Sequence, residues 1–292
     1  MEESISEKAV KPPSHWFRFR ITTLLFLTAI FAIWLAVQAK RENDERRGTA
    51  AIRDAGGSVK FDYQFSEDGK LITNAIPPTT EVLRKAVGDE YFTSVVEAQA
   101  NTQRFGDEEV AQLEGLKELT SLRLFETDIT DQGIQSIGKL NRLEIVDVRN
   151  DDVTDSGLAI LGRLTNLKKL LLDGTKVTDG GLLHIKNLHN LEILFLSGTS
   201  VTDAGLEHLS GLRHLKELHL AGTQITDEGL VHIKDLPELS ELLLSNTGIT
   251  DAAIAHLQDL KALRFISLVG TEVSEAGVLE LKMQLPNTQI NR

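Results

Sequence analysis

The sequence predicts an α/β solenoid, a right-handed β-α superhelix with a parallel sheet on its concave side and helices on its convex side. The first observation behind this prediction is a phrase, Leu-x-x-Leu-x-Leu, that recurs every 24 residues without insertion. The second is the pattern after each recurrence, where a turn is followed by apolar residues at helical spacing. A constant period between about 20 and 50 residues is typical of stacked supersecondary units. The phrase begins at Leu119, Leu143, Leu167, Leu191, Leu215, Leu239 and Leu263.

The unit that begins at Leu191 indicates how each repeat folds. We expect Leu194 and Leu196 to face inward from a short strand, Thr202 and Asp203 to begin a helix, and three apolar residues to lie next on one helical face. One unit alone cannot bury so many leucines, whereas stacking places the strands side by side, about 4.8 Å apart. Because helices are wider than strands, the stack should curve with its strands on the inside.

The chain is expected to divide into five parts. Residues 1–20 form a polar tail, residues 21–39 a transmembrane helix, and residues 40–92 a juxtamembrane helix and an N-terminal capping region. Residues 93–280 hold one degenerate repeat, with its strand at 95–100, and seven clear repeats, and residues 281–292 form a C-terminal cap. Within the capping region we expect a charged helix over 40–55, a half-buried strand over 59–65 and a short helix near 80–87.

The stretch from Ile21 to Ala39 contains no charged residue. As a helix it would be about 28 Å long, close to the ~30 Å thickness of bilayer hydrocarbon. A cleaved signal peptide is the alternative, because Val37 and Ala39 are small enough for a cleavage site, but the run is longer than a typical signal-peptide core. Basic residues are nearly balanced on the two sides. A first span behind a short tail usually exports the C-terminal part of a chain, so we expect an extracytoplasmic repeat domain.

Composition and motifs argue against several classes of function. The chain has 43 acidic and 31 basic residues, a net charge of -12, and no basic stripe that would neutralise nucleic-acid phosphates. The absence of cysteine removes disulfides, thiolate metal sites and a cysteine nucleophile. There is no G-x-S-x-G, no phosphate-binding glycine loop and no H-E-x-x-H. We therefore expect a protein that is not an enzyme, has no cofactor and binds no nucleic acid.

Two recurring polar columns are best explained by structure. Asp131, Asp155 and their equivalents come after a threonine at each expected helix start, where a carboxylate accepts backbone N–H groups. A calcium site along this acidic row is the less favoured alternative. The other column should turn inward and bond backbone groups that the turn leaves unpaired. Its members are Thr127, Asp151, Thr175, Thr199, Thr223, Thr247 and Thr271.

A histidine column lies on the expected helical side of the repeats. One imidazole per stacked helix does not give the converging ligands that zinc requires, so a metal site is not favoured. A consensus position without a special role is the simplest interpretation, and a pH-responsive or surface role remains open. The members are His184, His208, His232 and His256.

The phrase LxxLxLxGTxVTDxGLxHL resembles the leucine-rich repeat superfamily, and most closely its cysteine-containing subclass, although Thr or Asp stands at the first cysteine column here. From about residue 15 onward the chain is similar to bacterial membrane-anchored leucine-rich repeat proteins, including the segment AAIRDAGGSVKFD at residues 50–62. No F-box-like segment is present, so a ubiquitin-ligase role is not implied. The resemblance implies a binding surface rather than an active site.

Two outward-pointing columns of the expected strands vary between units, whereas other positions repeat their residue type. Such variation suits a specific surface, and apolar residues on an exposed sheet often mark an interaction site. We expect a protein or peptide partner to bind this concave face. The alternatives are the helical side, an edge, or self-association as a structural or spacer protein of the cell envelope. The candidate residues are Arg123, Phe125, Asp147, Arg149, Leu171, Asp173, Phe195, His219, Leu243 and Ser267.

Overall fold

The computed structural model describes residues 14–66, 69–72, 75 and 94–292, with side chains described from residue 26 onward. The chain divides into two compact units, Met1–Asn43 and Asp44–Arg292. The helix expected near residues 80–87 and the first part of the polar tail lie outside the described residues.

In the first unit the described residues form a single helix. Helix α1 runs from Ser14 to Asp54, and its residues up to Asn43 belong to this unit. Large apolar side chains along it are exposed, and the rings of Phe31 and Trp34 stack with their centroids 5.7 Å apart. From residue 26 to residue 43, where side chains are described, no residue of α1 is buried.

The prediction of a single-pass membrane protein is wrong for this structure. Among the described residues, no helix is both long and apolar enough to cross a membrane. The charged residues Lys40 and Arg41 continue the same helix. The expected extracytoplasmic location depended on that span and is wrong with it.

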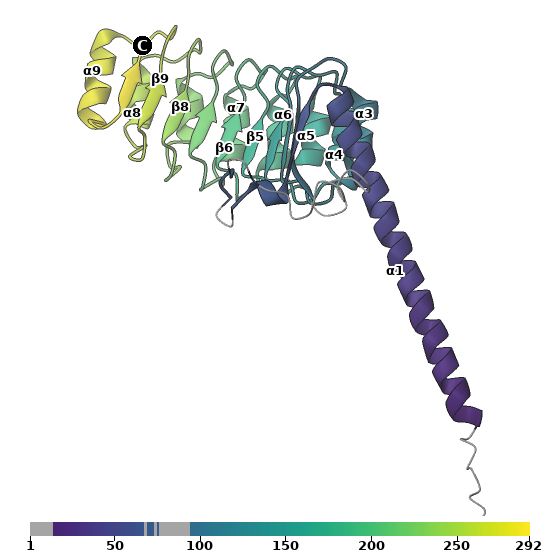
Figure 1. Ribbon diagram of the computed structural model, residues 1–292. Helices are drawn as coiled ribbons and strands as arrows, with labels where there is room; N and C mark the ends of the chain where they lie inside the picture. The colour runs from purple at the N-terminus through teal and green to yellow at the C-terminus, as the bar shows by residue number, and fades with distance from the viewer. Residues whose placement is uncertain (1–13, 67–68, 73–74, 76–93) are drawn as a thin grey trace, which may run out of the picture. The chain divides into compact units, whose positions relative to one another are not determined.

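In the second unit the described strands form one sheet in sequence order, β1 to β10 (Figure 1). β1 pairs antiparallel with β2, and every later pair is parallel and in register, as Leu170 opposite Leu194 illustrates. The predicted α/β solenoid with a parallel sheet is confirmed. The strands are β1 Ser58–Phe61, β2 Val95–Ala100, β3 Ser121–Leu124, β4 Ile145–Asp147, β5 Lys169–Leu171, β6 Ile193–Phe195, β7 Glu217–His219, β8 Glu241–Leu243, β9 Phe265–Ser267 and β10 Gln289–Asn291.

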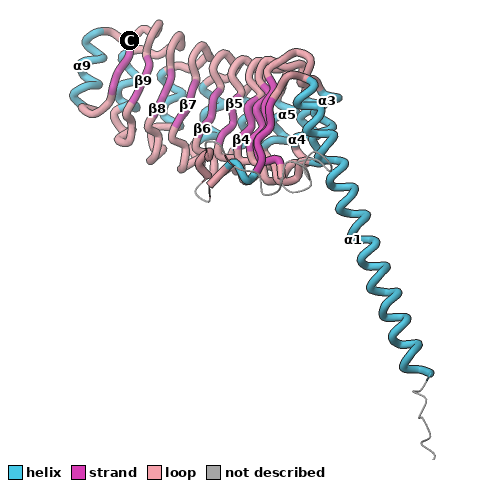
Figure 2. The backbone as a smooth tube through the Cα atoms, viewed as in Figure 1, coloured by secondary structure: helices cyan, strands magenta, loops and turns pink. Residues whose placement is uncertain are grey.

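The helices of the repeats lie together on one side of this sheet, as Figure 2 shows. Several are short 3₁₀ helices (η), which suits core residues spaced three apart, such as Leu206, Leu209 and Leu212. The helical elements are η1 Asp62–Gln64, α3 Asp107–Ala111, η3 Gln112–Gly115, α4 Asp131–Ile137, α5 Asp155–Leu161, α6 Asp179–Ile185, α7 Asp203–Leu206, η4 Glu207–Leu209, η5 Asp227–His232, η6 Asp251–Ala253, α8 Ile254–Leu257 and α9 Glu275–Gln284.

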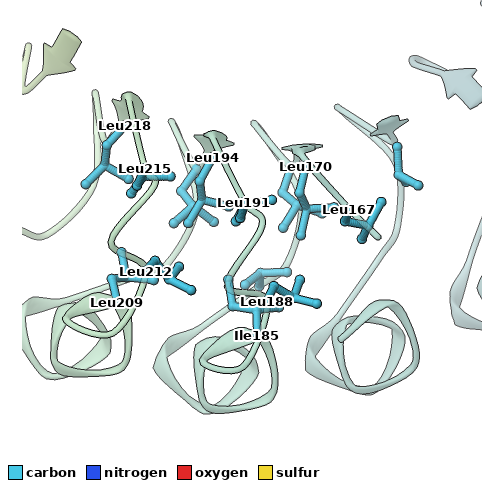
Figure 3. Packing of buried hydrophobic residues seen from close by; sticks show 14 of the residues in the cluster. Leu167, Leu170, Ile185, Leu188, Leu191, Leu194, Leu209, Leu212, Leu215 and Leu218 are labelled. Carbon is cyan, nitrogen blue, oxygen red and sulfur yellow. The ribbon is translucent and has the colours of Figure 1, made fainter. Parts of the chain in front are cut away.

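The core is a continuous layer of leucine between the strands and the helices (Figure 3). Leu191 and Leu194 reach it from the strand side, and Ile185 and Leu188 reach it from the helix side, all fully buried. Burying a leucine stabilises a fold by about 1.5–3 kcal/mol. Because each unit covers the leucines of its neighbours, the stack fixes the position of every strand and of the side chains between the buried ones.

Both ends of the stack carry atypical elements. Ile52 of α1 and Phe61 of β1 are buried in the same core as the repeats. Gly56, with φ of 81°, ends α1, as expected for a left-handed residue after a helix. β1 is shorter than the strand expected over 59–65, because η1 replaces its second half. β2 spans the residues expected for the strand of the degenerate repeat, α9 is the helix of the last clear repeat, and β10 lies within the residues expected for the C-terminal cap.

Candidate binding surface on the strand side

The outward side chains of β3 to β9 form the surface that we call the strand face. The central residue of each short strand is buried, as Leu194 is in β6, so the residues on either side of it point outward. The sequence identified two of the outward columns and missed a third. Strict alternation along each strand would have found it, because residues two apart share a face. The third column is Ile145, Lys169, Ile193, Glu217, Glu241 and Phe265.

Four candidate residues on neighbouring strands form what we call the apolar row: Leu171, Phe195, His219 and Leu243. The strand register places each directly beside the next. The rings of Phe195 and His219 are stacked, with centroids 3.6 Å apart and an angle of 11° between their planes. All four side chains are partly exposed. The row is therefore a continuous, largely apolar strip across β5 to β8.

Asp147, at the end of β4, and Arg149, two residues further on, are already paired with each other within the protein. Arg149 donates two hydrogen bonds to Asp147, each 2.8 Å long, and its guanidinium lies 5.6 Å from the ring centroid of Phe125. The Asp147 carboxylate raises the pKa of Arg149. Asp147 is only 2% exposed. The structure therefore leaves Arg149 and Phe125 accessible at this end, but removes Asp147 from direct contact with a partner.

Two further candidates differ in accessibility. Ser267 is 6% exposed, and its hydroxyl lies 2.8 Å from that of Ser245. Arg123 is partly exposed on β3. The apolar row thus ends at β9 in a hydroxyl pair with little free surface.

Carboxylates surround His219. Its Nε2 lies 3.3 Å from Oε1 of Glu241, while Asp173 and Glu217 also act on its charge. Burial lowers the pKa of His219, against the opposing effect of Glu241. Burial raises the pKa of Asp173, although Asp173 accepts a 2.7 Å hydrogen bond from the backbone N–H of Ser197. A half-buried imidazole, whose charged form is disfavoured by burial, is therefore held among acidic groups.

The surface is also hollowed near the start of the sheet. Phe65, Val96, Thr120 and Ile145 line part of an open hollow of about 360 Å³ at the beginnings of β2 to β4. The hollow is separate from the apolar row, which begins at β5.

The inward threonine column bonds the backbone, as the sequence predicts. The hydroxyls of Thr175, Thr199 and Thr223 each donate a 2.6 Å hydrogen bond to the carbonyl three residues earlier. The prediction is confirmed for Thr175, Thr199, Thr223, Thr247 and Thr271, whereas the hydroxyl of Thr127 donates to the Asp151 side chain. These bonds satisfy carbonyls in the turn after each strand, and so fix the end of the strand face.

The aspartate column accepts backbone N–H groups as predicted, but in the next repeat rather than its own. Asp179 accepts from the backbone N–H of Thr202 at 2.8 Å and from its hydroxyl at 2.7 Å. The helix that Asp179 begins is capped instead by Thr178, whose hydroxyl accepts from Gly180. Each aspartate therefore joins two consecutive repeats. The sequence of a single repeat could not reveal this arrangement.

Asp151 is the exception in the threonine column. Its Oδ1 accepts the backbone N–H of Thr127 at 2.7 Å and the Thr127 hydroxyl at 2.9 Å. Its Oδ2 has no hydrogen-bond partner among the described residues, and the residue is 3% exposed. Burial raises the pKa of Asp151 to about 7. The carboxyl group is thus poised to hold a proton in the folded protein.

The histidine column lies on the helix side of consecutive repeats, where its members are partly or fully exposed. Within the described part of the chain, no three histidine, aspartate or glutamate side chains gather as metal ligands would. A pH-responsive role for these histidines stays a prediction.

Comparison with known proteins agrees with this geometry. A sequence model described as a leucine-rich repeat matches residues 117–138 and 211–233. Together with the repeated strand and helix, this shows a leucine-rich repeat protein. Such repeats are typical protein-interaction modules and generally non-catalytic scaffolds. No match was found among curated proteins. The resemblance to a bacterial group stays a prediction.

Proposed function

We propose that the protein binds a protein or peptide partner through the strand face, with the apolar row as the central contact. The observation that supports this best is the continuity of Leu171, Phe195, His219 and Leu243 across four strands in fixed register. The role of the strand face in binding is our inference from its shape and chemistry.

The physical argument begins with the rigidity of the row. Backbone groups of β5 to β8 are paired with neighbouring strands, so a partner can be recognised only through side chains. The buried leucines beneath hold those side chains in place, which lowers the entropy lost on binding. Binding energy in interfaces concentrates in a few aromatic or apolar anchors surrounded by polar groups. Phe195 beside His219 is such an anchor, and Asp173, Glu217 and Glu241 supply the polar surround.

The test compares two double variants of the full chain. Phe195→Asp with Leu243→Asp places charge on the apolar row. The control, Leu183→Asp with Val231→Asp, places the same charge on the helix side, where these residues are 42% and 40% exposed. Circular dichroism first establishes that both variants are folded.

We expect a partner captured by the wild-type chain to be retained by the control and lost by the row variant, because only the latter disrupts the apolar contact. Capture that survives the row variant contradicts the proposal. A change from oligomer to monomer in the row variant, with no partner lost, supports the self-associating alternative instead.

A further inference from the structure

The polar side chains around His219 in the apolar row are acidic. Glu217 lies two residues before His219 on β7, Glu241 contacts His219 from β8, and Asp173 lies beyond the end of β5. In the described residues, none of these three carboxylates forms an ion pair with lysine or arginine. Glu217 and Glu241 therefore lie side by side near one imidazole without an ion pair to a lysine or arginine, whereas Arg149 acts on the charge of Asp173.

The basic side chains Lys216 and Arg149 are paired with other carboxylates, and Lys169 lies farther along the sheet. Lys216 pairs with Glu192 at 2.8 Å, and Arg149 pairs with Asp147. Lys169 shares the strand face but lies two strands from Glu217, with Ile193 between them. Among the described residues, the ion pairs of Lys216 and Arg149 are therefore made with carboxylates other than Glu217 and Glu241.

We propose, on the basis of the proposed function, that the partner segment carries a lysine or arginine side chain next to an aliphatic or aromatic one. The apolar side chain lies on Leu171 and Phe195, and the cation lies between Glu217 and Glu241. An acidic or phosphorylated segment would meet like charges, and a purely apolar one would cover carboxylates without compensating them.

The sheet also sets the distance between the apolar and the basic side chain of the partner segment. The apolar side chain lies midway between β5 and β6, and the cation lies midway between β7 and β8. These two points are two strand spacings apart, which is about 10 Å. An extended peptide covers about 3.3 Å per residue. A segment that crosses the strands therefore reaches both positions with its apolar and basic residues about three apart.

The test is a selection of phage-displayed random 12-residue peptides on the full chain, with counter-selection on the folded Phe195→Asp variant. We expect enrichment of lysine or arginine about three residues from an aliphatic or aromatic residue. A synthetic enriched peptide should then bind at least tenfold more weakly to Glu217→Gln with Glu241→Gln. Glu207→Gln, an exposed glutamate on the helix side, is the matched control and should leave affinity unchanged.

The outcomes separate this inference from the proposed function. Phe195-dependent peptides without basic residues, or peptides indifferent to the Glu217 and Glu241 substitutions, overturn the inference and leave the proposed function standing. A selection that yields no Phe195-dependent peptide overturns both. An oligomer of the chain that Phe195→Asp converts to monomer identifies a second copy as the occupant and also overturns the inference.

Discussion

Replacing Asp151 by asparagine should stabilise the protein in a pH-dependent manner. The oxygen of the new side chain could still accept from Thr127, and its amide would replace the oxygen that has no described partner. The substitution removes a group whose pKa is raised to about 7 in the folded chain, against an ordinary value of 3.8. When folding raises the pKa of a carboxyl group, the group makes its full contribution to stability at pH values below the pKa that it has in the unfolded chain. That contribution is lost as pH rises through the folded pKa.

The size of the effect comes from the same two values. Each factor of ten in proton affinity corresponds to about 1.36 kcal/mol. The rise in the pKa of Asp151 from 3.8 to about 7 therefore lowers the unfolding free energy of the wild type by about 4 kcal/mol above neutral pH. Below about pH 4 it lowers the unfolding free energy by almost nothing. The gain in unfolding free energy of Asp151→Asn over wild type should grow between pH 4 and pH 7, then become constant.

Urea unfolding followed by far-UV circular dichroism at pH 5, 6, 7 and 8 measures this gain. The matched control is Asp152→Asn, because the adjacent carboxylate is 66% exposed and pairs with Lys176 at the surface. A surface pair contributes about 0–1 kcal/mol. An Asp151→Asn gain that is equal at pH 5 and pH 8 would refute the reasoning, because it would show that burial does not raise the pKa of Asp151.

Two further predictions concern the hydrogen bonds that join each aspartate to the next repeat, and the charge of the strand face. Gly205→Ala should destabilise the fold by about 1–3 kcal/mol, because its new Cβ would lie 2.4 Å from Oδ1 of Asp179. Gly211→Ala, whose nearest neighbour is 3.8 Å away, should change the unfolding free energy little. Binding of a selected basic peptide should weaken from pH 7.5 to 5.5, because burial raises the pKa of Asp173, so that this carboxylate loses its charge at a higher pH than an ordinary aspartate. Titration calorimetry that shows equal affinity at both pH values would contradict this prediction.

The period of the sequence predicted most of the fold because each repeat has only one way to bury its leucines. A 24-residue interval places equivalent residues opposite each other, so Leu171 had to lie beside Phe195. The same alternation contains the third outward column, including Ile193 and Glu241, which lies outside the two variable columns identified from the sequence. The threonine bonds were also predictable, since one polar side chain recurs among buried leucines.

Several side-chain contacts were not predictable from the repeat pattern. The pairing of Arg149 with Asp147, which makes the carboxylate inaccessible, depends on side-chain conformations that periodicity does not specify. The bond from Asp179 to the next repeat depends on the close approach of Gly205. The exception at Asp151 is visible in the sequence, but its raised pKa results from burial that only the folded chain provides.

The central claim is that a partner occupies the strand face. Its most direct test is site-specific photo-crosslinking of the full chain, with a photoreactive amino acid at position 195 in one protein and at position 183 in the other. Position 195 lies in the apolar row, and position 183 is exposed on the helix side. We expect a selected peptide to form an adduct from position 195 and none from position 183. An adduct from position 183 alone would contradict the account.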